Sequence, residues 1–148
     1  LLDYGVSDVK VSWSGPDGEG AFEGQVLTAF MANGAYCGGG MWVGKGGTMH
    51  DACLDITMLP PTSVGRSLAD TWRLYDGSAW RTKGARRFRA SSLKAEPLSD
   101  KKVLLEVDGE QPGCLPLQMR VLEGAIQVRG GWLSSPLLDA DDTAAWRP

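Results

Sequence analysis

A glycine-rich stretch in the first half of the chain gathers many of the residues that could do chemistry. Residues 33 to 56 read NGAYCGGGMWVGKGGTMHDACLDI and hold the only histidine, His50, together with two aspartates and two cysteines. Asp51 and Asp55 offer oxygen ligands for a hard cation such as Mg²⁺, which needs only one or two carboxylates. A turn aspartate that bonds its own backbone explains Asp51 at least as well.

His50, Cys53 and Cys37 raise the question of a zinc site in the same stretch. Structural zinc sites usually show paired short spacings such as two CxxC units, whereas this chain offers one loose pair. Burial as small apolar side chains explains the two cysteines better. With Cys114 the chain has three cysteines, which form no even disulfide set, so we expect them to be reduced and the protein to be cytoplasmic.

A second pair of carboxylates, Asp108 and Glu110, lies in the sequence EVDGEQPG at the end of an expected strand. A sheet can hold a carboxylate rigidly there while leaving it exposed. Asp-Gly is also the ordinary signal of a hairpin turn, so the residues alone favour a turn.

The segment from Arg73 to Lys94 is strongly basic, with seven basic residues and one acid, Asp76. Such a segment could meet anionic lipid headgroups. A solvated loop is the commoner explanation of a charge run. The whole chain has a net charge of −3 and a pI near 5.1, which argues against nucleic acid as the main partner.

The elements that must position these residues are mainly strands. Alternating apolar and polar residues predict a first strand at 6–13, and a turn at 14–20 leads into a second strand pattern. The further strand patterns occupy residues 21–34, 53–59, 86–96, 102–107, 115–122 and 125–130. We therefore expect an antiparallel β-sandwich or a partly closed barrel of six or seven strands, with residues 108–114 as a turn.

One amphipathic helix is expected at about 63–76. Thr62 or Ser63 can cap its start, and Gly77 can end it. Apolar side chains fall on one face at helical spacing, namely Val64, Leu68, Trp72 and Tyr75.

The chain of 148 residues has the length of one domain, and we place a β-rich domain at 1–130 and a tail at 131–148. Its longest apolar runs are far shorter than the roughly 18 residues that a membrane-spanning helix needs. The chain begins at Leu1 with neither an initiator methionine nor a signal-peptide pattern, so we expect a piece of a longer protein.

Taken together, two ordered motifs resemble the C-terminal domain of lipid kinases of the diacylglycerol kinase and sphingosine kinase type, especially the bacterial ones. The first motif comprises Asn33, Gly34, Tyr36, Gly38, Gly39, Gly40, Asp51, Leu54 and Asp55. The second comprises Asp108, Gly109, Glu110, Leu115, Pro116, Val121, Ala125 and Ile126. The resemblance covers roughly residues 25 to 130, and the two motifs stand some fifty residues apart.

The resemblance implies roles for particular residues. Asp51 would hold Mg²⁺, helped by backbone oxygens near Thr48 and Cys53, and Glu110 would accept the proton of the lipid hydroxyl. In the family, ATP binds to a separate N-terminal domain with a Gly-Gly-Asp-Gly-Thr motif, and this chain has no such motif. We therefore expect the chain to be inactive without that domain.

Four residues depart from the family's pattern around the metal-binding aspartate, namely Lys45, Gly47, His50 and Ala52. Ala52 stands where the family has glycine, which is costly only if the position takes a positive φ.

The resemblance implies an enzyme that phosphorylates diacylglycerol to phosphatidic acid with ATP, as a soluble protein peripheral to the membrane. A sphingoid-base or ceramide substrate and a homodimer stay open. The alternative of another class is a non-catalytic β-sandwich that binds a lipid or a protein, with its carboxylates merely in turns.

Overall fold

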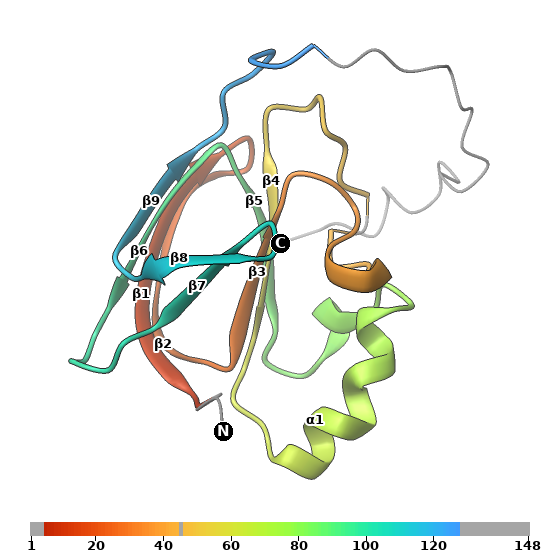
Figure 1. Ribbon diagram of the computed structural model, residues 1–148, viewed down its shortest axis with the longest axis vertical. Coiled ribbons are helices and arrows are strands. Elements are labelled where there is room, and N and C mark those ends of the chain that lie inside the picture. Colours follow the sequence, from red (N-terminus) through yellow and green to blue (C-terminus); the bar gives the residue numbers. More distant parts are fainter. Residues whose placement is uncertain (1–4, 45, 128–148) are drawn as a thin grey trace.

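The computed structural model describes residues 5–44 and 46–127, and its architecture is mainly β, as the sequence predicts (Figure 1). The strands of this part of the chain are β1 (Ser7–Gly15), β2 (Gly18–Val26), β3 (Thr28–Ala32), β4 (Leu54–Leu59), β5 (Arg86–Ala90), β6 (Ser92–Pro97), β7 (Leu104–Val107), β8 (Glu110–Cys114) and β9 (Leu117–Arg120). The helical elements are α1 (Val64–Asp70) and the 3-10 turns η1 (Gly38–Gly40), η2 (Thr71–Leu74) and η3 (Ala79–Arg81).

The strands form three sheets in which every neighbouring pair is antiparallel. One sheet has the order β2-β1-β6-β9 and another has the order β3-β4-β5, and Figure 1 shows these two side by side. The third is the two-stranded hairpin β7-β8, which lies across the front of the molecule in this view. The predicted β-sandwich is confirmed.

The core lies between the two larger sheets, because each contributes one apolar face. Val9 and Val11 of β1 are buried with Ile56 and Met58 of the central strand β4. The rings of Trp13 and Phe88 stack with centroids 3.9 Å apart and join β1 to β5 across the sandwich.

Two predicted strands are each divided in the structure. The pattern at 21–34 becomes β2 and β3, which belong to different sheets, and the pattern at 86–96 becomes β5 and β6, which also separate. Alternation along the chain cannot reveal these breaks, because the period of two resumes after each corner.

The end of the chain departs from the predicted pattern too. The expected turn at 108–114 is confined to its first two residues, since β8 begins at Glu110. Residues 125–127 of the strand predicted at 125–130 are not in a strand, and residues 128–130 lie outside the described residues, as does the predicted tail at 131–148.

The predicted helix is confirmed but is shorter. Ser63 caps α1 by accepting a hydrogen bond from the backbone N–H of Arg66 at 3.4 Å, and α1 continues directly into η2. No helix among the described residues is long and apolar enough to cross a membrane.

Candidate functional site

The glycine-rich loop connects β3 to β4 and begins with a tight turn. The backbones of Cys37 and Met41 exchange two hydrogen bonds of 2.9 Å around η1. The three glycines of η1 all have positive φ values, 24°, 67° and 93°. Residues with a side chain rarely adopt such a backbone conformation. The conformation of the turn therefore explains the three glycines without a bound phosphate.

Asp51 lies in the loop, as the sequence predicts, and both of its carboxylate oxygens accept hydrogen bonds. The backbone N–H of Cys53 donates to Oδ1 at 3.1 Å, and Nη2 of Arg89 donates to Oδ2 at 2.6 Å. Ala52, between Asp51 and Cys53, has a φ of 59°. The lipid kinases that the sequence resembles have glycine at this position. Ala52 adopts the left-handed conformation there, which is unfavourable for a residue with a Cβ atom.

Asp55 lies on β4, as predicted, and its side chain is 4% exposed. Nη2 of Arg87 donates to its Oδ1 at 3.0 Å. Burial raises the pKa of the Asp55 carboxyl, and the hydrogen bond from Arg87 offsets only part of that rise. A Cβ atom on Gly47 would lie 2.5 Å from Oδ2 of Asp55, so only glycine lets the loop pass so close.

The loop returns to the sandwich through two further bonds. The hydroxyl of Thr57 donates to the carbonyl of Val43 at 3.1 Å, and both residues are buried. The backbone N–H of Trp42 donates to the carbonyl of Leu74 at 2.6 Å, which ties the loop to η2. The loop is thus anchored to β4 and to the helical segment that follows it.

Arg87 and Arg89 are the site residues that the sequence interpretation missed. Both belong to the basic segment that we expected to face solvent or lipid, yet each pairs with a loop or strand carboxylate. They lie two apart on β5, and Asp55 is directly opposite Arg89 in the β4-β5 register. Alternating arginines beside a strand that carries a buried aspartate could have indicated this pairing.

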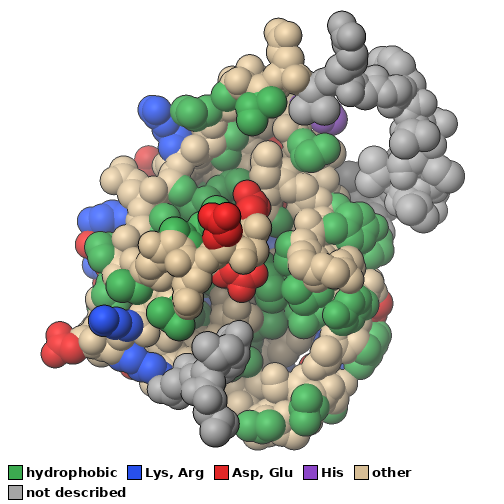
Figure 2. All heavy atoms as spheres, viewed as in Figure 1, with side chains coloured by type: hydrophobic (Ala, Val, Ile, Leu, Met, Phe, Trp, Pro, Cys, Tyr) green, Lys and Arg blue, Asp and Glu red, His purple; other side chains and the backbone are tan. Residues whose placement is uncertain are grey.

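Glu110 lies at the first position of β8, opposite Val107, and is exposed. The turn before it, Asp108 and Gly109, has positive φ at both residues, 51° and 88°, as a two-residue hairpin requires. Figure 2 shows acidic side chains near the middle of the face that is turned to the viewer in Figure 1. The exposed acidic residues of the hairpin are Glu106, Asp108 and Glu110.

The charge of a hairpin residue acts on a thiol of the glycine-rich loop. Burial raises the pKa of the Cys37 thiol in the loop, and the charge of Glu106 on β7 raises it further. Thr48 and Asn33 have no side-chain hydrogen bond with another described residue. Asp51 contacts Cys53, and Asp55 lies against Gly47.

The free lone pairs of the Asp51 carboxylate favour binding of a hydrated Mg²⁺, whereas its ion pair with Arg89 opposes binding. A carboxylate oxygen that accepts one hydrogen bond keeps a second lone pair, and Mg²⁺ needs few protein ligands because it retains water. The guanidinium of Arg89, however, already balances the charge of Asp51. No group of three His, Cys, Asp or Glu side chains that could hold a metal occurs within residues 5–44 and 46–127.

Comparisons with known proteins agree with this architecture. Residues 3–130 match the family described as YegS C-terminal NAD kinase beta sandwich-like domain. A search of curated proteins gives no match.

Among solved structures, a proposed diacylglycerol kinase from Bacillus anthracis strain Sterne superposes with a TM-score of 0.62 at 21% identity, over 84% of this chain and 38% of that one. A structure from the same strain described as a diacylglycerol kinase gives 0.60 at 22% identity, over 81% and 39%. The chain thus spans less than two fifths of the length of these proteins, and the likeness is one of fold.

Proposed function

The chain belongs to the family of YegS C-terminal NAD kinase β-sandwich-like domains, and on that premise we propose that it is the lipid-binding side of an ATP-dependent lipid kinase. The reaction would transfer the γ-phosphoryl group of ATP to the hydroxyl of diacylglycerol and release phosphatidic acid. The observation that supports the proposal is that Glu110 is exposed directly after the two-residue turn of the β7-β8 hairpin.

Glu110 would act as the general base. As the lipid oxygen attacks the γ-phosphorus, the carboxylate would take its proton, while positioning and metal charge stabilise the transferring group. A glutamate in water has a reference pKa of about 4.3 and is a weak base at neutral pH. Burial against a nucleotide-binding domain would strengthen such a base, which is why we expect no transfer by this chain alone.

Asp51, with backbone oxygens near Thr48 and Cys53, would hold a hydrated Mg²⁺ and stabilise the loop. The support is that the N–H of Cys53 holds the Asp51 carboxylate at 3.1 Å, whereas Mg²⁺ would have to compete with Arg89, whose Nη2 lies 2.6 Å from Oδ2. Such a carboxylate cannot rotate away from the loop. ATP would bind mainly to the N-terminal domain, outside this chain.

The test is the transfer of labelled γ-phosphate by the complete reading frame that contains the chain. Diacylglycerol and sphingosine are offered in parallel in mixed micelles with Mg²⁺. We expect label in diacylglycerol, and we expect Glu110→Gln to lower the rate by about 100-fold or more, because a general base contributes at least that much.

The matched control is Glu106→Gln, which makes the same chemical change at another exposed position of the hairpin. It should leave the rate within a few-fold of the original. Label in sphingosine alone would assign a sphingoid-base kinase instead. Unchanged transfer by Glu110→Gln would refute the role of Glu110, and a folded protein that labels neither lipid would favour a non-catalytic binding module.

A further inference from the structure

The helical segment formed by α1 and η2 presents its apolar side chains to solvent. Val64, Leu68, Trp72 and Tyr75, which we name the apolar stripe, follow one another at intervals of four, four and three residues. Their exposed fractions are 78%, 72%, 55% and 56%. Neither α1 nor η2 contains a buried residue. A surface helix normally packs such a face on the core, so this orientation is the reverse of the usual one.

Polar side chains of the same segment turn toward the protein. Ser67, Asp70 and Arg73 line a cavity of about 120 Å³, together with Phe30 of β3 and Leu59 of β4. They are half-buried, unlike the apolar stripe.

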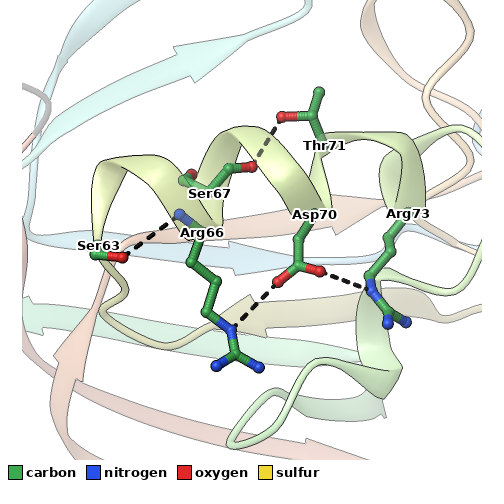
Figure 3. A network of polar contacts seen from close by, with 6 residues as sticks. All are labelled: Ser63, Arg66, Ser67, Asp70, Thr71 and Arg73. Atoms are coloured by element: carbon green, nitrogen blue, oxygen red, sulfur yellow. Dashed lines mark hydrogen bonds and ion pairs between the residues drawn. The ribbon is translucent and has the colours of Figure 1, made fainter.

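A network of polar contacts orders the helical segment itself (Figure 3). Asp70 accepts a hydrogen bond from Nε of Arg73 at 3.1 Å and forms an ion pair with Nε of Arg66 at 3.6 Å. The hydroxyl of Thr71 donates to the carbonyl of Ser67 at 2.9 Å. These contacts lie within the segment, and the backbone N–H of Trp42, which donates to the carbonyl of Leu74 at 2.6 Å, ties the segment to the glycine-rich loop.

The segment that carries the apolar stripe and the residues that follow it are rich in basic side chains. Residues 60–86 hold five basic and two acidic residues, although the chain as a whole has a net charge of −3. Two arginines share the single carboxylate of Asp70. Exposed Arg81, Lys83 and Arg86 form no ion pair with another described residue. Figure 2 shows hydrophobic side chains over the part of the surface where Figure 1 places α1.

We propose that the apolar stripe docks on an anionic bilayer surface, with the neighbouring cations among the lipid headgroups. Tryptophan and tyrosine side chains favour the membrane interface, and a helix with one apolar and one charged side can lie in its plane. Anionic lipid supplies both the apolar region and the counter-charge. The proposal rests on the proposed function, because a bilayer is where a diacylglycerol substrate resides.

The test measures co-sedimentation of the complete protein with vesicles in the absence of ATP. Vesicles of phosphatidylcholine are compared with vesicles of mixed phosphatidylcholine and phosphatidylglycerol. We expect binding to the mixed vesicles, and we expect Leu68→Gln/Trp72→Gln to lower the partition coefficient by about tenfold or more, since apolar surface then stays in water. Arg81→Gln/Lys83→Gln should lower it by about fivefold per residue on anionic vesicles only.

The matched control is Ile126→Gln, which replaces a side chain that is 82% exposed beyond β9. It should leave vesicle binding unchanged. A second readout is phosphate transfer to a short-chain, water-dispersed diacylglycerol, which the variants should perform at the original rate.

Three outcomes would overturn the proposal. They are a protein that does not bind the mixed vesicles, stripe variants that bind as well as the original, and stripe variants that change the oligomeric state instead. The last outcome would assign the apolar stripe to a protein interface. Because binding is measured without ATP, a failure of the kinase proposal alone leaves the docking result readable.

Discussion

Replacement of Ala52 by glycine should stabilise the protein, although glycine normally weakens ordered structure. Ala52 has a φ of 59°, in the left-handed region, between Asp51 and Cys53, whose N–H donates to the Asp51 carboxylate. Its Cβ therefore crowds the neighbouring backbone, as it would in a left-handed helix. Glycine has no Cβ and adopts this conformation freely.

The expected gain follows from two opposing contributions. A residue with a side chain pays about 1–2 kcal/mol in the left-handed region. Glycine avoids that cost but gives the unfolded chain more freedom, which costs about 0.5–1 kcal/mol. The free energy of unfolding should therefore rise by about 0.5–1 kcal/mol. For a chain of this length the melting temperature should rise by about 1–4 °C.

Urea denaturation followed by circular dichroism measures this change. Ala69→Gly is the matched control, because Ala69 lies within α1 and is exposed, so the same substitution there should cost about 1 kcal/mol. Opposite signs at the two positions are the decisive result. Equal destabilisation at both positions would refute the reasoning, since it would mean that Ala52 is not strained.

Two further changes test the surroundings of Asp55. Gly47→Ala should destabilise the protein by about 1–3 kcal/mol, because its Cβ would lie 2.5 Å from Oδ2 of Asp55. Gly65→Ala, in α1 with open space around it, should instead be neutral or stabilising in the same urea denaturation. Burial raises the pKa of the Asp55 carboxyl above 3.8, so the folded protein keeps the Asp55 proton to a higher pH than the unfolded chain does. The contribution of Asp55 to the free energy of unfolding therefore falls as pH rises just above 3.8. Denaturation from acid to neutral pH should show the stability of the original protein falling relative to Asp55→Asn in that window. A relative gain with rising pH would mean that Arg87 outweighs burial.

The sequence predicts local chemistry well where neighbouring residues decide it. Asp51 in the loop and Asp55 on β4 follow from a glycine-rich turn that leads into an apolar strand. The turn at Asp108 and Gly109 follows because this dipeptide tolerates positive φ.

Pairing between distant segments could not be predicted in the same way. The alternating arginines of β5 indicate that carboxylate partners exist, but the partners, Asp55 on β4 for Arg87 and Asp51 in the loop for Arg89, depend on how distant segments meet. The period of the apolar stripe likewise tells which residues share a face. It does not tell whether that face points inward, because that depends on how the segment packs against the sandwich, and here the apolar stripe is exposed.

The hairpin β7-β8 makes its own two-stranded sheet, apart from the ladders of the sandwich. Changes within its turn therefore leave the hydrogen bonds of the two larger sheets untouched. Residues of the hairpin turn can therefore be replaced without breaking a hydrogen bond of the sandwich sheets. A library confined to 106, 107 and 111, with the turn and Glu110 kept, would be a practical route to altered acceptor preference if Glu110 acts as proposed.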